Sequence, residues 1–223
     1  WRFLHETHPP EARFRPRPKA LLRNHAWILL NPRFQRFAAA GGFNFASLFL
    51  YIASAPAFVL HHLRLGEDQF GWFFVPTIAG MVFGSFLSGR AAGRIGGNRL
   101  AGIGFAVCGS AGLLNLLYNL WLPQPSIPWA VLPMAINALG ISLVFPILTL
   151  AILDMYPRQR GAASSLQAFT SLILQTIVAG VLSPLLAPHP MRLALGSAAA
   201  TAIGFAFWWW EVSRTRLPPD DAE

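Results

Sequence analysis

Polar side chains recur at helical spacing inside segments that are otherwise apolar. The candidates are Asn44, Ser47, Tyr51, Asn137, Gln167, Ser171 and Gln175. The first three are spaced by three and four residues and the last three by four, so each set shares one helix face. Polar groups at membrane depth must face protein or water. Two interpretations stay open for each residue: a hydrogen bond between helices, or the lining of a substrate cavity.

Carboxylates, histidines, lysines and arginines are absent from the interior of these apolar segments, and Asp154 stands at the end of one. A membrane-embedded enzyme that uses metal would need clustered acids, and a channel would need a ring of charges or carbonyls. We therefore predict that the chain is not an enzyme and holds no metal or organic cofactor. Proton coupling needs a titratable group at membrane depth, so a proton-carrying acid is expected outside this chain.

The segments that carry the polar residues are long enough to cross a bilayer as helices. They are residues 37–60, 70–88, 100–121, 129–152, 162–186 and 193–210. Of the 223 residues, 54% are hydrophobic and 12% are charged, and the mean hydropathy is +0.47. Soluble domains carry about 25% charged residues. The expected fold is an all-α polytopic membrane protein with six transmembrane helices, compatible with a 3+3 inverted repeat.

Basic residues are distributed unequally between the two sides that six spans define. All of the 17 lysines and arginines except Arg64 and Arg192 fall on the side of the two termini. The positive-inside rule therefore predicts that both termini are cytoplasmic. The net charge of +8 does not indicate nucleic acid, because the basic residues lie between apolar runs and form no basic helix face. The lipid bilayer is the expected partner.

The predicted layout has three parts. Residues 1–36 form a cytoplasmic loop in which 19–30 make an amphipathic helix on the membrane surface. Residues 37–210 form the transmembrane domain, and 211–223 form a cytoplasmic tail. Because the chain opens at Trp1 in a polar, proline-rich stretch, we expect a longer polypeptide to precede it.

Two predicted cytoplasmic loops combine turn-forming and charged residues that suit a gating role. Their candidate residues are Gly89, Arg90, Arg94, Gly96, Arg99, Asp154, Pro157 and Gly161. Glycine and proline end helices and allow sharp reversals. The arginines can interact with helix C-termini and with carboxylates on neighbouring helices.

These loops resemble those of the major facilitator superfamily. Arg94, Gly96 and Arg99 are similar to its G-x-x-x-D-R-x-G-R-R signature at the copy in the second half, although the aspartate is absent. Three further stretches resemble the bicyclomycin-resistance (Bcr/CflA) branch of drug/proton antiporters. They are Leu4-His-Glu-Thr7, Tyr51-Ile-Ala-Ser-Ala-Pro-Ala-Phe-Val-Leu60, and Leu153-Asp154 with Pro157 and Gly161-Ala-Ala-Ser-Ser-Leu166.

The resemblance implies the C-terminal half, helices seven to twelve, of a twelve-helix secondary transporter. It implies proton-driven export of drug-like compounds across the bacterial inner membrane, and a missing N-terminal six-helix half as partner. The first, second, fourth and fifth spans would line the cavity, which favours Asn44, Tyr51, Gln167, Ser171 and Gln175 over Asn115 and Asn119. The aromatic candidates are Phe43, Phe45, Tyr51, Trp72 and Phe145.

Two alternatives to drug export stay open. The same superfamily includes importers of metabolites, and the sequence does not decide direction. A truncated remnant that does not transport would also show these spans and loops.

Overall fold

Helices form the whole regular structure of the residues described in the computed structural model, which are 18–122 and 124–215. Their order and bounds are α1 Pro18–Leu30, α2 Pro32–Ala53, η2 Ala57–His62, η3 Glu67–Gln69, α3 Gly71–Ala91, α4 Gly97–Trp121, α5 Leu132–Met155, α6 Arg160–Ile177, η4 Val178–Leu182, α7 Ser183–Leu186 and α8 Pro190–Thr215. The all-α prediction is confirmed for these residues.

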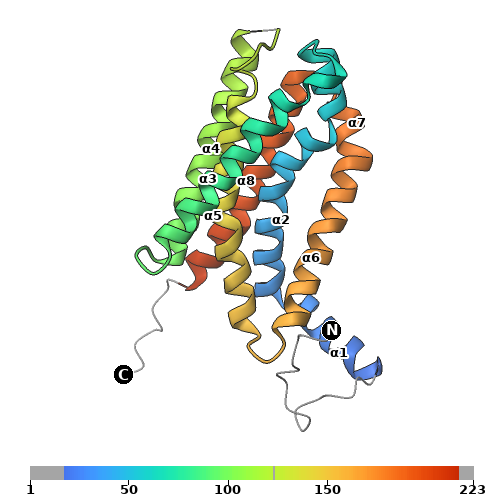
Figure 1. The fold of residues 1–223 in the computed structure, drawn as a ribbon. Helices are drawn as coiled ribbons and strands as arrows, with labels where there is room; N and C mark the ends of the chain where they lie inside the picture. Colours follow the sequence, from blue (N-terminus) through green and yellow to red (C-terminus); the bar gives the residue numbers. More distant parts are fainter. Residues whose placement is uncertain (1–17, 123, 216–223) are drawn as a thin grey trace, which may run out of the picture.

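The long helices run side by side as a bundle (Figure 1). We call the end where α1 lies and α8 finishes the base, and the opposite end the top. The most extensive contacts join α2 to α8, α4 to α5, and α3 to α5. Helix α2 also contacts α5 and α6. Helix α5 therefore contacts α2, α3 and α6, although α4 separates it from α2 and α3 along the chain.

Length and hydropathy identify five helical segments within the described residues as able to cross a membrane. They are Glu67–Ala91, Gly97–Trp121, Leu132–Met155, Arg160–Leu186 and Pro190–Arg214. Helix α2, which carries Arg33 and Arg36 in its first turns, is not among them. The count of six spans and the inverted repeat thus stay predictions.

Glycines permit the close approach of α3 to α5. A Cβ at Gly80 would collide with the carbonyl of Ala135, and one at Gly84 would lie 2.9 Å from Cβ of Ser142. These two glycines are four residues apart, so they lie on the same face of α3. Small residues let helix backbones pack closely in membranes, where contact rather than the hydrophobic effect stabilises the pair.

The top of the bundle contains two π-helical segments, η2 and η4, which continue α2 and α6. Ser54 and Ser183 share a hydrogen bond of 2.7 Å between their hydroxyls. A ring nitrogen of His62 lies 2.7 Å from the carbonyl oxygen of Ala187. These contacts connect the upper ends of α2 and α6, where each helix departs from α-helical geometry.

At the base, α1 packs against the loop that joins α5 to α6. Ile28 is buried, and the ring of Trp27 meets Tyr156 edge to face at 5.6 Å between centroids. Asn31 then caps α2 by accepting a hydrogen bond from the backbone N–H of Arg33. The predicted helix over 19–30 is thus present as α1, with Leu22 exposed. Its position on a membrane surface stays a prediction.

Candidate functional site

A groove open on one side lies between α2, α3, α5 and α6. We call it the central groove and define it by the residues that line it: Phe45, Met81, Ser85, Ile141, Ser142, Phe145, Pro146, Ser171 and Gln175. Its volume is about 390 Å³, within the range of small-molecule sites. Residues from four helices that are distant in sequence therefore converge on one concave surface.

Most of the groove is apolar, and its few polar groups lie on α3, α5 and α6. Ser171 is buried, and its hydroxyl has no hydrogen-bond partner among the described residues. Gln175 is half-buried one turn further along α6. Pro146 has no N–H, so the carbonyl of Ser142 lacks its usual helical donor. The groove can thus combine broad apolar contact with a small number of hydrogen bonds to a bound molecule.

Two of the candidates on α6 lie in the central groove, and their role in binding a substrate stays a prediction. Ser171 and Gln175 both line the central groove, together with the aromatic candidates Phe45 and Phe145. Gln167 is on the same helix but is buried, and its amide nitrogen donates to the hydroxyl of Thr149 on α5 at 3.0 Å. It therefore joins two helices rather than lining the groove.

The candidates on α2 lie inside the bundle instead of in the groove. The amide of Asn137 donates to the hydroxyl of Ser47 at 2.9 Å, and that of Asn115 donates to the Tyr51 hydroxyl at 2.7 Å. Ser197 on α8 donates to the Ser47 carbonyl. Tyr51 and Asn115 are thus partners inside the bundle, and the preference for Tyr51 over Asn115 as a cavity residue stays a prediction.

Asn44 and Phe43 are also directed away from the central groove. Asn44 is buried, and its backbone nitrogen would lie 3.0 Å from a Cβ at Gly204, so α8 approaches α2 closely there. Phe43 stacks on Phe207 of α8 at 6.1 Å. The polar face of α2 meets α8 because the small residues of both helices let their backbones approach.

A test distinguishes this buried role from a cavity role. Tyr51→Phe would leave the amide of Asn115 unpaired in the bundle, and we expect a loss of about 0.5–1 kcal/mol in the free energy of unfolding. Thermal denaturation of the purified protein measures it. Tyr118→Phe is the matched control, because its hydroxyl bonds to the exposed Ser126, where water can replace it. Equal stability of both variants would contradict the buried role.

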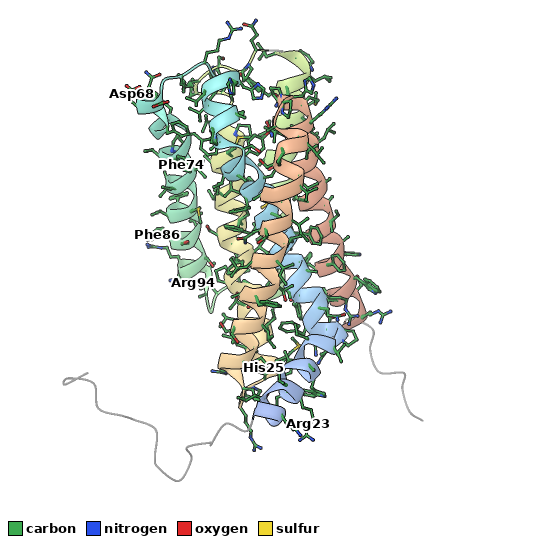
Figure 2. The ribbon with its side chains drawn as sticks, turned by 90° about the vertical axis from the view of Figure 1, so that its right-hand side faces the viewer. Arg23, His25, Asp68, Phe74, Phe86 and Arg94 are labelled. Atoms are coloured by element: carbon green, nitrogen blue, oxygen red, sulfur yellow. The ribbon has the colours of Figure 1, made fainter. Side chains whose placement is uncertain are left out.

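Trp72 lies outside the central groove, and its assignment to a substrate cavity stays a prediction. It lies near the upper end of α3, its side chain is 55% exposed, and it is not part of the central groove. Figure 2 shows α3 along one edge of the bundle, with Asp68 at its upper end and Phe86 and Arg94 towards the base.

The two predicted loops lie at the base, as Figure 1 shows. In the first, Arg90 lies over the ring of Phe86 at 5.5 Å, and Gly93 has a positive φ of 76°, which glycine adopts readily. The exposed residues of this loop include Gly89, Arg94, Gly96 and Arg99.

In the second loop, between α5 and α6, the side chain of Asp154 pairs with that of Arg160 at 3.3 Å, and both are largely exposed. Pro157 and Gly161 flank the start of α6. Their gating role stays a prediction.

The sequence analysis missed a buried acid at the base. Glu211 was assigned to the tail, but α8 continues to Thr215. Its side chain is 3% exposed and binds Arg33 at 2.8 Å and Arg36 at 2.6 Å. A signal existed, because Arg33 and Arg36 share one face of a helix that Pro32 begins.

Comparisons with known proteins agree with this architecture. Residues 37–223 match the family model described as "Major Facilitator Superfamily". The chain is 26% identical over 170 residues to the "Bicyclomycin resistance protein homolog" of Haemophilus influenzae, which covers 72% of this chain and 40% of that protein. It is also 26% identical over 161 residues to the "Multidrug transporter MdfA" of Edwardsiella piscicida and to that of Edwardsiella tarda. Each of these matches covers 71% of this chain and 38% of the relative. The chain thus spans about 40% of the length of these relatives.

Proposed function

Because the chain belongs to the major facilitator superfamily, we propose that it is the C-terminal six-helix half of a secondary transporter that exports drug-like small molecules from a bacterium. Transport, not catalysis of a reaction, is the function that we assign. The observation that carries the proposal is the central groove, which α2, α3, α5 and α6 line and which is open on one side. The names of the relatives, a bicyclomycin resistance protein and multidrug transporters, support export of such compounds.

The lining of the groove supports a range of hydrophobic substrates. Phe45, Met81 and Phe145 offer apolar and polarisable surface. Apolar contacts discriminate weakly between compounds of similar size. Ser171 and Gln175 can orient a substrate by hydrogen bonds without requiring a charge on it.

The orientation of the protein in the membrane and the energy source for transport are proposed from the sequence. The excess of basic residues supports a base of the bundle that faces the cytoplasm, and we propose that the protein lies in the inner membrane. Within the described residues, the acids are Glu67, Asp68, Asp154 and Glu211, and none faces the central groove. We therefore propose that export is driven by the proton gradient through an acid in the N-terminal half.

Variants of the groove test the proposal in the full-length protein. Phe145→Ala and Gln175→Ala should lower efflux of some fluorescent lipophilic substrates about tenfold and of others little, since each substrate uses different contacts. Efflux from cells under an imposed proton gradient measures this. Leu195→Ala is the control, because Leu195 is exposed on α8, a helix that does not line the groove.

The outcomes separate the competing functions. Uniform loss for every substrate at equal expression would argue against a substrate-binding groove. Accumulation instead of efflux under the same gradient would favour the alternative, import of a metabolite. Absence of transport by the intact wild-type protein would favour a remnant.

A further inference from the structure

A small internal cavity lies towards the top of the bundle and shares no residue with the central groove. Residues of α2, α4, α5 and α8 line it, and the polar ones are Tyr51, Asn115, Asn137 and Ser197. Each of these four residues is at most 6% exposed. The volume open to the centre of a water molecule is about 10 Å³, and about 10–15 Å³ is the least that holds one water. The cavity therefore has room for one water molecule and is too small for a substrate.

One residue of the cavity carries a hydrogen-bond acceptor that has no donor. The Oδ1 atom of Asn137 is buried and makes no hydrogen bond among the described residues. The Nδ2 atom of the same amide lies 2.9 Å from the hydroxyl of Ser47. Because Ser47 donates its own O–H to the carbonyl of Asn44 at 2.7 Å, it can only accept from Asn137. The nitrogen of the amide must therefore face Ser47, and the oxygen is left for another partner.

A donor without an acceptor belongs to the same cavity. The Tyr51 hydroxyl accepts from the amide nitrogen of Asn115 at 2.7 Å, and its own O–H donates in none of the hydrogen bonds found in the part of the chain that the structure describes. The oxygen of the Asn115 amide accepts from Asn119 at 3.0 Å, so the nitrogen is the atom that faces Tyr51. Ser197 donates to the carbonyl of Ser47 at 2.8 Å and keeps its hydroxyl lone pairs for a donor.

We propose that this cavity holds one ordered water molecule that joins α2, α5 and α8. The water accepts from the Tyr51 hydroxyl and donates to Oδ1 of Asn137 and to the hydroxyl of Ser197. Buried waters typically make about three hydrogen bonds to polar groups that otherwise lack partners. An apolar occupant would leave the donor and the acceptor unpaired. A cation would be a buried charge without compensation, because no acid among the described residues lines the cavity.

The water completes a chain of polar groups that is otherwise interrupted. From the upper end of α4, the amide of Asn119 donates to Asn115, and Asn115 donates to Tyr51. On the other side of the cavity, Asn137 donates to Ser47. The gap between these two sets of hydrogen bonds lies between the hydroxyl of Tyr51 and Oδ1 of Asn137. The water closes this gap, and the groups of α4 above it provide polar partners along a path from the top of the bundle.

X-ray hydroxyl-radical footprinting of the purified full-length protein tests the site, because radiolysis of a bound water oxidises the side chains beside it even when they are buried. Met134 lines the cavity and is 3% exposed, and its thioether is readily converted to the sulfoxide. We expect Met134 to be oxidised in the wild type. The rate should fall several-fold in Asn137→Leu, which removes the acceptor, and in Tyr51→Phe, which removes the donor. Ser197→Ala is a third and milder variant.

Controls separate loss of the water from general effects. Tyr118→Phe removes the same hydroxyl outside the cavity, and Met134 should be oxidised there as in the wild type. Phe34 is 1% exposed in the core at the base, so a rise in its oxidation identifies a variant that has unfolded. Absence of oxidation at Met134 in the wild type would overturn the proposal. The wild-type rate at Met134 in the folded variants of Asn137, Tyr51 and Ser197 would overturn it as well.

Discussion

Replacing Glu211 with alanine should lower the free energy of unfolding by about 2–3 kcal/mol, the largest effect that we expect from any single side chain at the base. Removal of one partner from a buried ion pair costs about 3–5 kcal/mol, because the remaining charge is left without compensation. We discount that range because Arg33 is 51% exposed and water screens its charge. The side chain of Arg36 is only 16% exposed, so its charge would lose more stabilisation than that of Arg33 when Glu211 is removed.

The contact also joins distant parts of the chain. It connects the beginning of α2, next to α1, with the end of α8. Arg36 and Arg214 both lie over the ring of Trp210, at 5.5 and 5.3 Å. Loss of Glu211 should therefore loosen the base of the bundle, and protease accessibility of the segment before α2 should rise with the loss of stability.

Thermal denaturation in detergent measures the effect, with an expected fall in Tm of about 5–10 °C. Asp154→Ala is the matched control, because the ion pair of Asp154 with Arg160 is 70% and 59% exposed and should contribute little. Arg36→Ala should destabilise more than Arg33→Ala. Equal Tm values for the Glu211 and Asp154 variants would show that the buried pair does not hold α8 to α2.

The sequence predicted where the helices lie along the chain better than it predicted which helices pack against each other. Apolar length and charge distribution indicated the helices, because a bilayer imposes both. Helical spacing also showed which residues share a face, and on α6 that face reaches the central groove at Ser171 and Gln175. On α2 the face of Ser47 and Tyr51 instead meets other helices of the bundle, through hydrogen bonds with Asn137 and Asn115. Spacing says that residues lie together and does not say which helix they meet.

Glu211 and Trp72 illustrate two other limits. Hydropathy assigns a glutamate beyond the last tryptophan to water, and only the fold shows that two arginines from the start of α2 come within 2.8 Å of it. An aromatic residue at the end of a span fits a cavity or a membrane interface equally well, and exposure on α3 excludes Trp72 from the groove. The burial of Glu211 and the exposure of Trp72 depend on which helices pack around them, and the local sequence does not give that information.

Expression of residues 1–223 alone should give no transport, whereas the full-length protein should export substrates of the central groove. The groove has walls from four helices and is open on one side. Helices α3 and α6 expose large apolar side chains, among them Ile78, Val82, Leu172 and Ile173. A second six-helix unit would cover such a face, and alternating access needs two units that rock against each other.

Efflux assays in cells that make the chain, the full-length protein, or the two halves as separate polypeptides check this expectation. Co-expression of the halves should restore efflux, because each half supplies one wall of the cavity, and Phe145→Ala in the C-terminal half should reduce it again for some substrates. An antibody against residues 214–223 should detect, in the source membranes, a polypeptide roughly twice as long as this chain. Robust efflux by residues 1–223 alone would contradict the half-transporter proposal, since two copies would then have to form the cavity, and a proton carrier would have to be sought among the residues of this chain.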